Sequence, residues 1–329
     1  QGDTVLNAGT IASPNGSAVF LLDGGSVTNQ AGGTIAGYTF GVKVTGTAGA
    51  VTNDGTVLST ATFTGSSGFD AAGVAVQAGG TVVNDGAIRA TWKGVEIGNI
   101  SASAGGTLIN QGFIYASNSS GSTGAAVWIH GPGEISNATA GTIAGGPFAI
   151  VSYYQTTVLN AGSIGATEFG VHAAGSATVV NTGRITGGTG GVGVGAGVYL
   201  ITGGAVTNQA SAVITGYHGV YATAGAATVV NAGTIAGSGK YGVELNDGGS
   251  VTNALGGSIT GTAFGIEING GGTVVDAGTI ANIYFFGTGS NRLVLDPGAA
   301  AGSVTASDSA SNTLELASSA STGTLAGLD

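Results

Sequence analysis

One asparagine recurs along this 329-residue chain at a nearly regular interval. Successive copies are 22, 24, 31, 26, 27, 23, 21, 27, 23 and 22 residues apart, and an aspartate, Asp276, follows 23 residues after the last copy. A repeat of this length is typical of a solenoid, in which each repeat forms one unit that stacks on the next. The asparagines are Asn7, Asn29, Asn53, Asn84, Asn110, Asn137, Asn160, Asn181, Asn208, Asn231 and Asn253.

The residues around each asparagine predict the shape of one repeat. Residues 250–253 (SVTN), 258–260 (SIT) and 265–268 (GIEI) each alternate or are β-branched, as short strands are. Glycines at 256, 257 and 261 fall between them, where corners need unusual backbone angles. Three strands and three turns in about 23 residues predict one coil of a parallel β-helix.

We therefore predict an all-β fold, a right-handed parallel β-helix with three strands per coil. It would hold about 12–14 coils of about 21–31 residues each. The right-handed choice rests on the strong preference of parallel crossover connections for that hand. We expect regular coils over residues 1–281. We expect degenerate terminal coils over 282–329, which lead toward a C-terminal region that this chain lacks.

Composition agrees with strands and turns and excludes several function classes. The chain has 67 glycines, 4 prolines, no cysteine and 7% charged residues. Its net charge is −10 with six Lys and Arg, so we expect no nucleic-acid partner, because such binding needs clustered cations. No cysteine means no disulfide framework and no thiolate metal site. The sequence contains no run of 18 apolar residues, so we expect no membrane-spanning helix.

Two sets of repeated side chains have a structural interpretation. Stacked at one corner, the asparagines from Asn29 to Asn253 would form a ladder of amide hydrogen bonds between coils. The aromatic residues that precede the third strand would form a second stack at a corner and cover the core. These aromatic residues are Phe40, Phe148, Phe169, Tyr241 and Phe264.

The repeats resemble a known family. Residues 28–37 (TNQAGGTIAG) and 231–237 (NAGTIAG), with the ending 291–298 (NRLVLDPG) and 312–316 (NTLEL), are similar to passenger domains of type V autotransporters of Gram-negative bacteria. The resemblance implies a right-handed β-helix that is exported to the cell surface and is most often an adhesin or a self-associating rod. We expect neither that family's C-terminal barrel nor its signal peptide within these 329 residues. We expect a cleaved or truncated passenger, or a related secreted β-helix.

Enzymatic chemistry has little support in the sequence. Glu244 and Glu267 hold the same repeat position in neighbouring coils, a spacing that would suit a retaining glycosidase. Both are expected on a flat strand with no cationic partner nearby. The three histidines, His130, His172 and His218, are far apart along the chain. We therefore predict a protein that is not an enzyme, with no cofactor, no metal and no catalytic residue.

One surface differs from the others. The outward position of the third strand is charged toward both ends of the chain and carries Trp128, His172, Tyr199 and Tyr221 in the middle. We predict a binding stripe there, flanked by insertions within residues 115–125 and 186–196. The alternative is that these aromatic side chains only stack between coils for stability. Exposed aromatic residues in a row suit sugar rings or a matching partner surface.

Three functions follow as hypotheses. The first is a non-enzymatic surface rod that acts in adhesion or self-association and binds itself, a surface glycan or a protein. The second is a secreted fibre subunit that assembles into a filament through coil ends or faces, because open strand edges pair readily. The third is a polysaccharide lyase or hydrolase. All three place the protein at the cell surface or outside the cell, and the sequence names no ligand.

Overall fold

The computed structural model describes residues 2–61, 71–99, 104–117, 124–189 and 195–317. These residues form strands and turns and contain no helix, so none of them belongs to a helix that could cross a membrane. The strands lie in three parallel sheets and each coil contributes one strand to each sheet, which confirms the predicted β-solenoid class. The chain divides into two compact units, Gln1–Gly175 and Ser176–Asp329.

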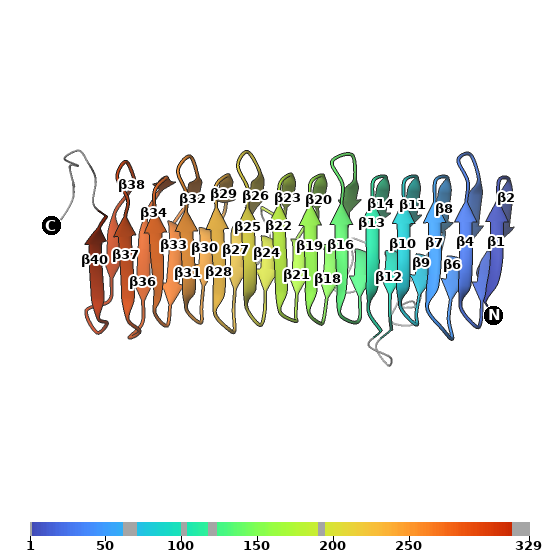
Figure 1. The fold of residues 1–329 in the computed structure, drawn as a ribbon, viewed down its shortest axis with the longest axis horizontal. Helices are drawn as coiled ribbons and strands as arrows, with labels where there is room; N and C mark the ends of the chain where they lie inside the picture. The colour runs from blue at the N-terminus through green and yellow to red at the C-terminus, as the bar shows by residue number, and fades with distance from the viewer. Residues whose placement is uncertain (1, 62–70, 100–103, 118–123, 190–194, 318–329) are drawn as a thin grey trace. The chain divides into compact units, whose positions relative to one another are not determined.

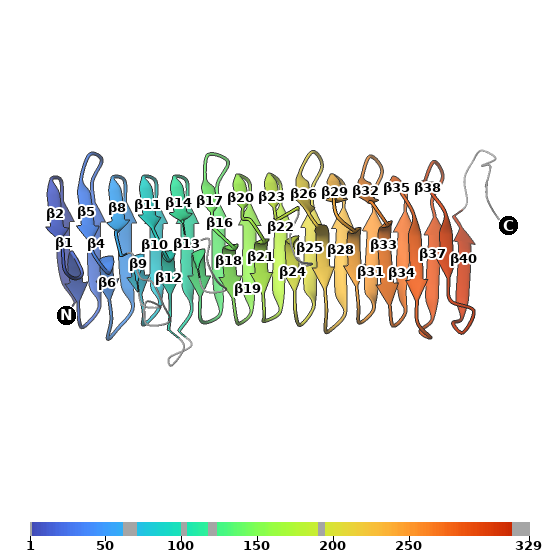
Figure 2. The same ribbon diagram turned by 180° about the vertical axis from the view of Figure 1, so that it is seen from behind.

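The first unit contains seven coils, whose equivalent strands lie side by side in sequence order (Figures 1 and 2). Its first sheet comprises β1 (Asp3–Asn7), β4 (Gly25–Asn29), β7 (Gly49–Asn53), β10 (Gly80–Asn84), β13 (Gly106–Asn110), β16 (Gly133–Asn137) and β19 (Thr156–Asn160). Its second sheet comprises β2 (Thr10–Ser13), β5 (Thr34–Gly37), β8 (Thr56–Ser59), β11 (Ala87–Ala90), β14 (Phe113–Ala116), β17 (Thr142–Ala144) and β20 (Ser163–Gly165). Its third sheet comprises β3 (Val19–Leu21), β6 (Phe40–Val44), β9 (Ala72–Val76), β12 (Lys93–Ile97), β15 (Ala125–Ile129), β18 (Phe148–Ser152) and β21 (Phe169–Ala173).

The second unit repeats this arrangement in six coils and one further strand. Its first sheet comprises β22 (Ala177–Asn181), β25 (Gly204–Asn208), β28 (Ala227–Asn231), β31 (Gly249–Asn253), β34 (Gly272–Asp276), β37 (Asn291–Leu295) and β40 (Asn312–Leu316). Its second sheet comprises β23 (Arg184–Thr186), β26 (Val213–Gly216), β29 (Thr234–Gly237), β32 (Ser258–Gly261), β35 (Thr279–Ile280) and β38 (Ala300–Ala301). Its third sheet comprises β24 (Ala196–Leu200), β27 (His218–Ala222), β30 (Tyr241–Leu245), β33 (Phe264–Asn269), β36 (Ile283–Phe286) and β39 (Val304–Ala306).

The core lies between the three sheets and is built from branched aliphatic side chains. In one coil, Val27, Ile35 and Val42 point inward from the first, second and third strands and are almost fully buried. Each lies in register with an equivalent side chain of the next coil, as Val27 does with Val51. The hydrophobic periodicity thus places one apolar residue per strand in a continuous column, and burial of these columns stabilises the stack.

The asparagines lie at the end of the first strand and are nearly or fully buried. In each unit the side-chain Nδ2 of one asparagine donates to Oδ1 of the next, and also to backbone carbonyls of its own turn and of the next coil. The side-chain bonds are 2.8–2.9 Å long. They join Asn7 to Asn29, Asn29 to Asn53, Asn53 to Asn84, Asn84 to Asn110, Asn110 to Asn137, Asn137 to Asn160, Asn181 to Asn208, Asn208 to Asn231, and Asn231 to Asn253.

Several of the asparagines are followed two residues later by a glycine (Asn-x-Gly), and in the interior coils this glycine has a steric cause. A Cβ placed on Gly55 would lie 2.2 Å from the carbonyl oxygen of Gly33 and 2.8 Å from Nδ2 of Asn29 in the preceding coil. No side chain fits at these distances. The Asn-x-Gly pattern is therefore one device, in which the amide ladder and the backbone of the next turn share a space that only glycine leaves open.

Candidate functional site

The outer face of the third sheet carries two columns of side chains. In β6, Val42 and Val44 are buried in the core, whereas Lys43 Nζ lies 4.4 Å from the centre of the Phe40 ring. Phe40 and Lys43, three residues apart, therefore share the outer face. Gly41 between them faces inward, because a Cβ there would lie 2.4 Å from Cγ1 of Val57.

This two-column arrangement corrects one sequence expectation. The aromatic residues at the start of the third strand do stack between coils, as Phe148 and Phe169 do with ring centres 5.6 Å apart. They lie within the third strand, however, and do not precede it, since β18 begins at Phe148 and β21 at Phe169. The Phe148 and Phe169 rings pack in a T-shaped arrangement with the His172 ring, with ring centres 5.2 and 5.4 Å away, so they lie against the outward column predicted from the sequence.

In the first unit the outer face holds a buried charged cluster on β12 and β15. The Glu96 carboxylate forms an ion pair with Lys93 Nζ, and Oε1 of Glu96 also lies 3.0 Å from Nε2 of His130. The three side chains are buried although they lie outside the core, with exposed fractions of 7%, 3% and 3% for Lys93, Glu96 and His130. A buried charge needs such partners, because an unpaired one would neutralise or leave the interior.

The partners also set the pKa of the Glu96 carboxyl. Burial alone raises this pKa, because it disfavours the charged form. The hydrogen bond with His130 and the charge and hydrogen bond of Lys93 lower it by more, so the net pKa lies below the ordinary value. Glu96 is therefore an ionised carboxylate at neutral pH.

Trp128, on β15, packs against this cluster. Its ring centre lies 5.3 Å from Lys93 Nζ and 5.6 Å from the His130 ring, and Tyr153, just after β18, lies 5.8 Å away. The Trp128 side chain points outward, as its position predicts. It is only 7% exposed, whereas Tyr153 is 46% exposed. The exposed aromatic surface at this place therefore belongs to Tyr153.

His172, the second residue of the predicted stripe, is half-buried on β21. Phe148 and Phe169 are among its aromatic neighbours. Burial lowers the pKa of the His172 imidazole, and a hydrogen bond with the backbone partly opposes that shift. The neutral ring is the favoured form there at neutral pH.

In the second unit the outer face carries a continuous run of aromatic contacts. Tyr199 on β24 stacks on Tyr221 of β27 with ring centres 5.1 Å apart, and Tyr221 stacks on His218 at 4.8 Å. His218 lies 5.6 Å from Tyr241 of β30. Tyr199 and Tyr221 are half-buried, so the structure brings these two stripe residues together with part of each ring exposed.

Carboxylates lie beside this run. His218 Nδ1 is 3.0 Å from Glu244 Oε2, and both side chains are buried. Burial raises the pKa of the Glu267 carboxyl, the hydrogen bond from Tyr241 opposes this, and the Glu244 charge adds to it. Burial and the bond to Glu267 also raise the pKa of the Tyr241 hydroxyl. The expectation that no cationic partner lies near these glutamates was wrong for Glu267, because the Lys240 charge acts to lower the pKa of its carboxyl.

The run continues toward the last coils. Tyr241 stacks on Phe264 of β33 at 6.2 Å, and Phe264 stacks on Tyr284 of β36 at 5.1 Å. Asn246, after β30, donates to the Tyr221 hydroxyl over 3.4 Å. Aromatic residues thus follow one another without a break on neighbouring strands of this sheet, an arrangement that the other two sheets of the unit lack in the described residues.

The sequence missed part of this face. Four residues of the outer face were not predicted, because strict alternation assigns only one outward residue to each third strand. These residues are Lys93, His130, Tyr153 and His218. Lys93 and His218 stand three residues before the outward residues Glu96 and Tyr221, at the start of their strands, so that position carries the signal for them. The insertions expected to flank the stripe fall largely outside the described residues, at 118–123 and 190–194.

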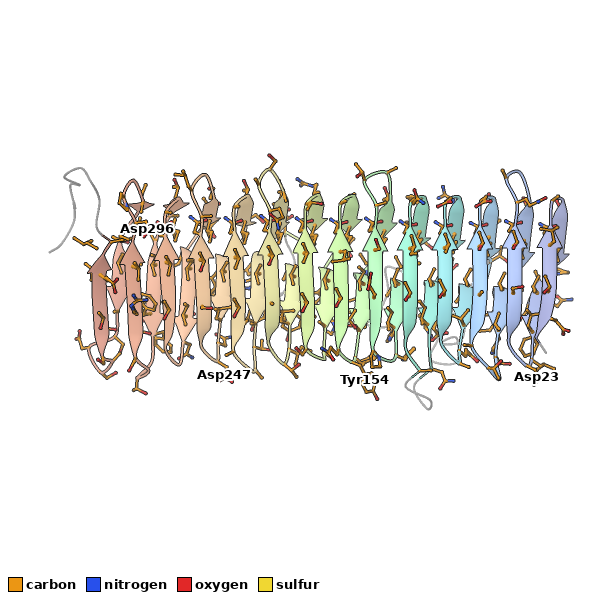
Figure 3. The ribbon with its side chains drawn as sticks, viewed as in Figure 1. Asp23, Tyr154, Asp247 and Asp296 are labelled. Atoms are coloured by element: carbon orange, nitrogen blue, oxygen red, sulfur yellow. The ribbon has the colours of Figure 1, made fainter. Side chains whose placement is uncertain are left out.

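The turns at the edges of the coils carry acidic and aromatic residues. Figure 3 shows Asp23 and Tyr154 at one edge of the first unit, in turns that lead from a third strand to a first strand. Asp247 lies in an equivalent turn of the second unit, where its Oδ2 accepts a hydrogen bond from the Gly225 amide over 2.8 Å. Asp296 lies in a turn between a first and a second strand.

Within the described part of the chain, no group of three or more His, Asp or Glu side chains is placed to hold a metal ion. Comparison of the chain with protein-family models, with curated proteins and with solved structures gives no match.

Proposed function

We propose that this chain is an exported β-solenoid of the cell surface that acts in adhesion or self-association and performs no catalysis. We take its coils to be right-handed and its class to be that of the autotransporter passengers that its repeats resemble. The observation that carries the proposal is a difference between faces of one unit. The outer face of the third sheet presents aromatic rings, whereas the outer face of the first sheet from β22 to β34 presents uncharged aliphatic and hydroxyl side chains. Charged side chains follow on the last two strands of that sheet, where Arg292 of β37 pairs with Glu315 of β40.

The first sheet supplies the contrast. On β22, β25, β28, β31 and β34 the outward residues are Thr178, Val180, Ala205, Thr207, Thr228, Val230, Ser250, Thr252, Thr273 and Val275. None is charged or aromatic. Such a surface fits the ordinary needs of a solvent-exposed strand. Half-buried aromatic residues in a row are more than stability requires of a sheet, and they are enriched where proteins bind partners.

Bead aggregation tests the proposal. Beads coated with the purified chain should clump, or should bind glycan-bearing cells. Tyr199→Ala with Tyr221→Ala should remove most of this activity, because it deletes two stacked, partly exposed rings of the aromatic run. The control is Thr228→Ala with Val230→Ala, two exposed residues of the first sheet, which should leave activity unchanged. Equal activity of the wild type and the tyrosine variant would refute this location.

A fibre subunit is the second candidate. The first coil exposes Leu6, Phe20 and Leu22 by 65%, 50% and 64%, more than most apolar residues of the chain. Such a group favours a further contact at that coil. Leu6→Ser with Leu22→Ser should abolish filaments seen by electron microscopy if they form there, and should not affect bead aggregation through the third sheet.

A lyase or hydrolase is the third candidate, and Glu244 with Glu267 would be its carboxylates. Glu244→Gln with Glu267→Gln should leave adhesion nearly intact under our proposal. Release of reducing sugar or unsaturated product from a polysaccharide panel by the wild type, and its loss in this variant, would replace the adhesion proposal with an enzyme.

A further inference from the structure

The cluster on β12 and β15 contains two polar atoms with unmet hydrogen bonds. Oε2 of Glu96 and Nε1 of Trp128 are both buried, and neither has a hydrogen-bond partner among the described residues. Glu96 and Trp128 lie in register on adjacent strands, in the same outward column. Leaving such atoms unpaired is costly, so each normally has a partner, in the protein or outside it.

The chemistry of the two atoms restricts that partner. Glu96 is ionised, so its Oε2 can only accept a hydrogen bond, whereas the Trp128 indole N–H can only donate one. A metal ion or ammonium group would leave the indole unmet, and a phosphate or carboxylate would be repelled by Glu96. A hydroxyl group both donates and accepts. It is the simplest single group that satisfies both atoms.

An exposed ring lies beside these atoms. Tyr153 is 46% exposed, and its ring centre lies 5.8 Å from Trp128 and 6.1 Å from His130. A sugar ring has apolar C–H faces that pack on aromatic rings, and hydroxyl groups at its edge. Tyr153 is therefore placed to hold the ring of a ligand whose hydroxyl reaches inward.

We propose that Glu96, Trp128 and Tyr153 form a carbohydrate-binding subsite, in which one sugar hydroxyl donates to Glu96 Oε2 and accepts from Trp128 Nε1. Lys93 and His130 hold the Glu96 carboxylate in place through its other oxygen. The inference rests on the proposed adhesive function and names glycan as its ligand class. The alternative occupant is one buried water molecule, which could make the same two bonds.

The two tryptophans provide a direct readout. In ¹⁵N-tryptophan-labelled protein, the indole N–H groups of Trp92 and Trp128 give two signals, which Trp92→Phe assigns. Titration with glucose, galactose, mannose and N-acetylglucosamine, and with β-linked disaccharides of these, should shift the Trp128 signal for at least one sugar. The Trp92 signal should move less, because Trp92 packs in a different cluster, with Ala61 and Ala71.

Two neighbouring tyrosines give a matched pair of variants. Tyr153→Ala should weaken that sugar's binding by about tenfold or more, while Tyr154→Ala, 43% exposed in the same turn, should leave it unchanged. If no sugar moves the Trp128 signal, and that N–H shows only contacts with water, the occupant is a water molecule and the subsite proposal falls. Bead aggregation that persists in that case leaves the adhesive function standing. Sugar binding without any adhesion refutes the adhesive function instead.

Discussion

Asn253 donates its side-chain Nδ2 to Oδ1 of Asp276 over 2.9 Å, and Oδ2 of Asp276 is buried with no hydrogen-bond partner in the described chain. In the asparagines that precede Asp276 in this ladder, the atom equivalent to Oδ2 is the side-chain nitrogen Nδ2, which donates to the next coil. The residue in register beyond Asp276 is Leu295, which has no amide to receive it. The aspartate therefore ends the ladder of the second unit.

The ending changes the chemistry of that rung. Asn253 donates to the carbonyl of Gly257 in its own turn and to that of Thr279 in the next coil. The equivalent carbonyls at Asp276 are those of Gly278 in its own turn and Ala300 in the next coil. An ionised oxygen facing carbonyls is unfavourable, whereas a protonated one donates. Burial raises the pKa of the Asp276 carboxyl, bonds from Asn253 and Gly278 oppose this, and the charge of Asp296 adds to it.

This shift predicts a pH dependence with a definite sign. Because the folded pKa exceeds the ordinary value of 3.8, the folded state holds the proton more tightly than the unfolded chain. The resulting stability is fully present below pH 3.8 and is lost as pH rises through the folded pKa. Asp276→Asn should remove this dependence and slow amide exchange in β37 and β40 at neutral pH. The same exchange rates and pH profile in both proteins would contradict a raised pKa.

The ladder itself should be measurable inside one unit. Asn84 accepts from Asn53 and donates to Asn110, whereas Asn7 has a side-chain partner on one side only, Asn29. Asn84→Ala leaves buried groups unpaired in two neighbouring coils and should lower the free energy of unfolding by about 1–3 kcal/mol. Asn7→Ala should cost less. Urea titrations that give both variants the stability of the wild type would show that the ladder adds nothing.

The glycine of the Asn-x-Gly pattern offers a second test with its own control. A Cβ on Gly233 would lie 2.3 Å from the Ala212 carbonyl and 2.9 Å from Asn208 Nδ2, whereas a Cβ on Gly9 would meet nothing within 4 Å. Gly233→Ala should therefore destabilise the fold by about 1–3 kcal/mol through overpacking. Gly9→Ala should be close to neutral. If thermal unfolding midpoints place the two variants together, the steric account of the motif is wrong.

The fold could be predicted from the sequence because every coil repeats the same pattern of residues. The β-branched runs, the glycine corners and the asparagine period all indicate one three-strand coil, and the described strands have that arrangement. The side chains on the outer face of the third sheet were harder to predict. Its second column depends on Gly41 and its equivalents turning inward, a backbone detail that shifts the outward residues from alternation to a spacing of three.

Burial on that face was also beyond the sequence pattern. Trp128 and Tyr199 occupy the same repeat position, yet Trp128 is buried among Lys93, His130 and Tyr153 while Tyr199 is half-buried. Periodicity assigns a side chain to a face. Its exposure depends on neighbours from other coils, and the pairing of Glu96 with His130 joins residues 34 positions apart.

Blocking one face at a time tests the adhesive role of the third sheet most directly. The chain has no cysteine, so one introduced cysteine gives a single attachment point for a bulky polymer. Asn246→Cys places it beside Tyr221, and Thr228→Cys places it on the exposed first sheet of a nearby coil. Our account predicts that polymer at position 246 abolishes bead aggregation or glycan binding, whereas polymer at position 228 leaves it intact. Full activity with position 246 blocked, or loss only with position 228 blocked, would contradict it.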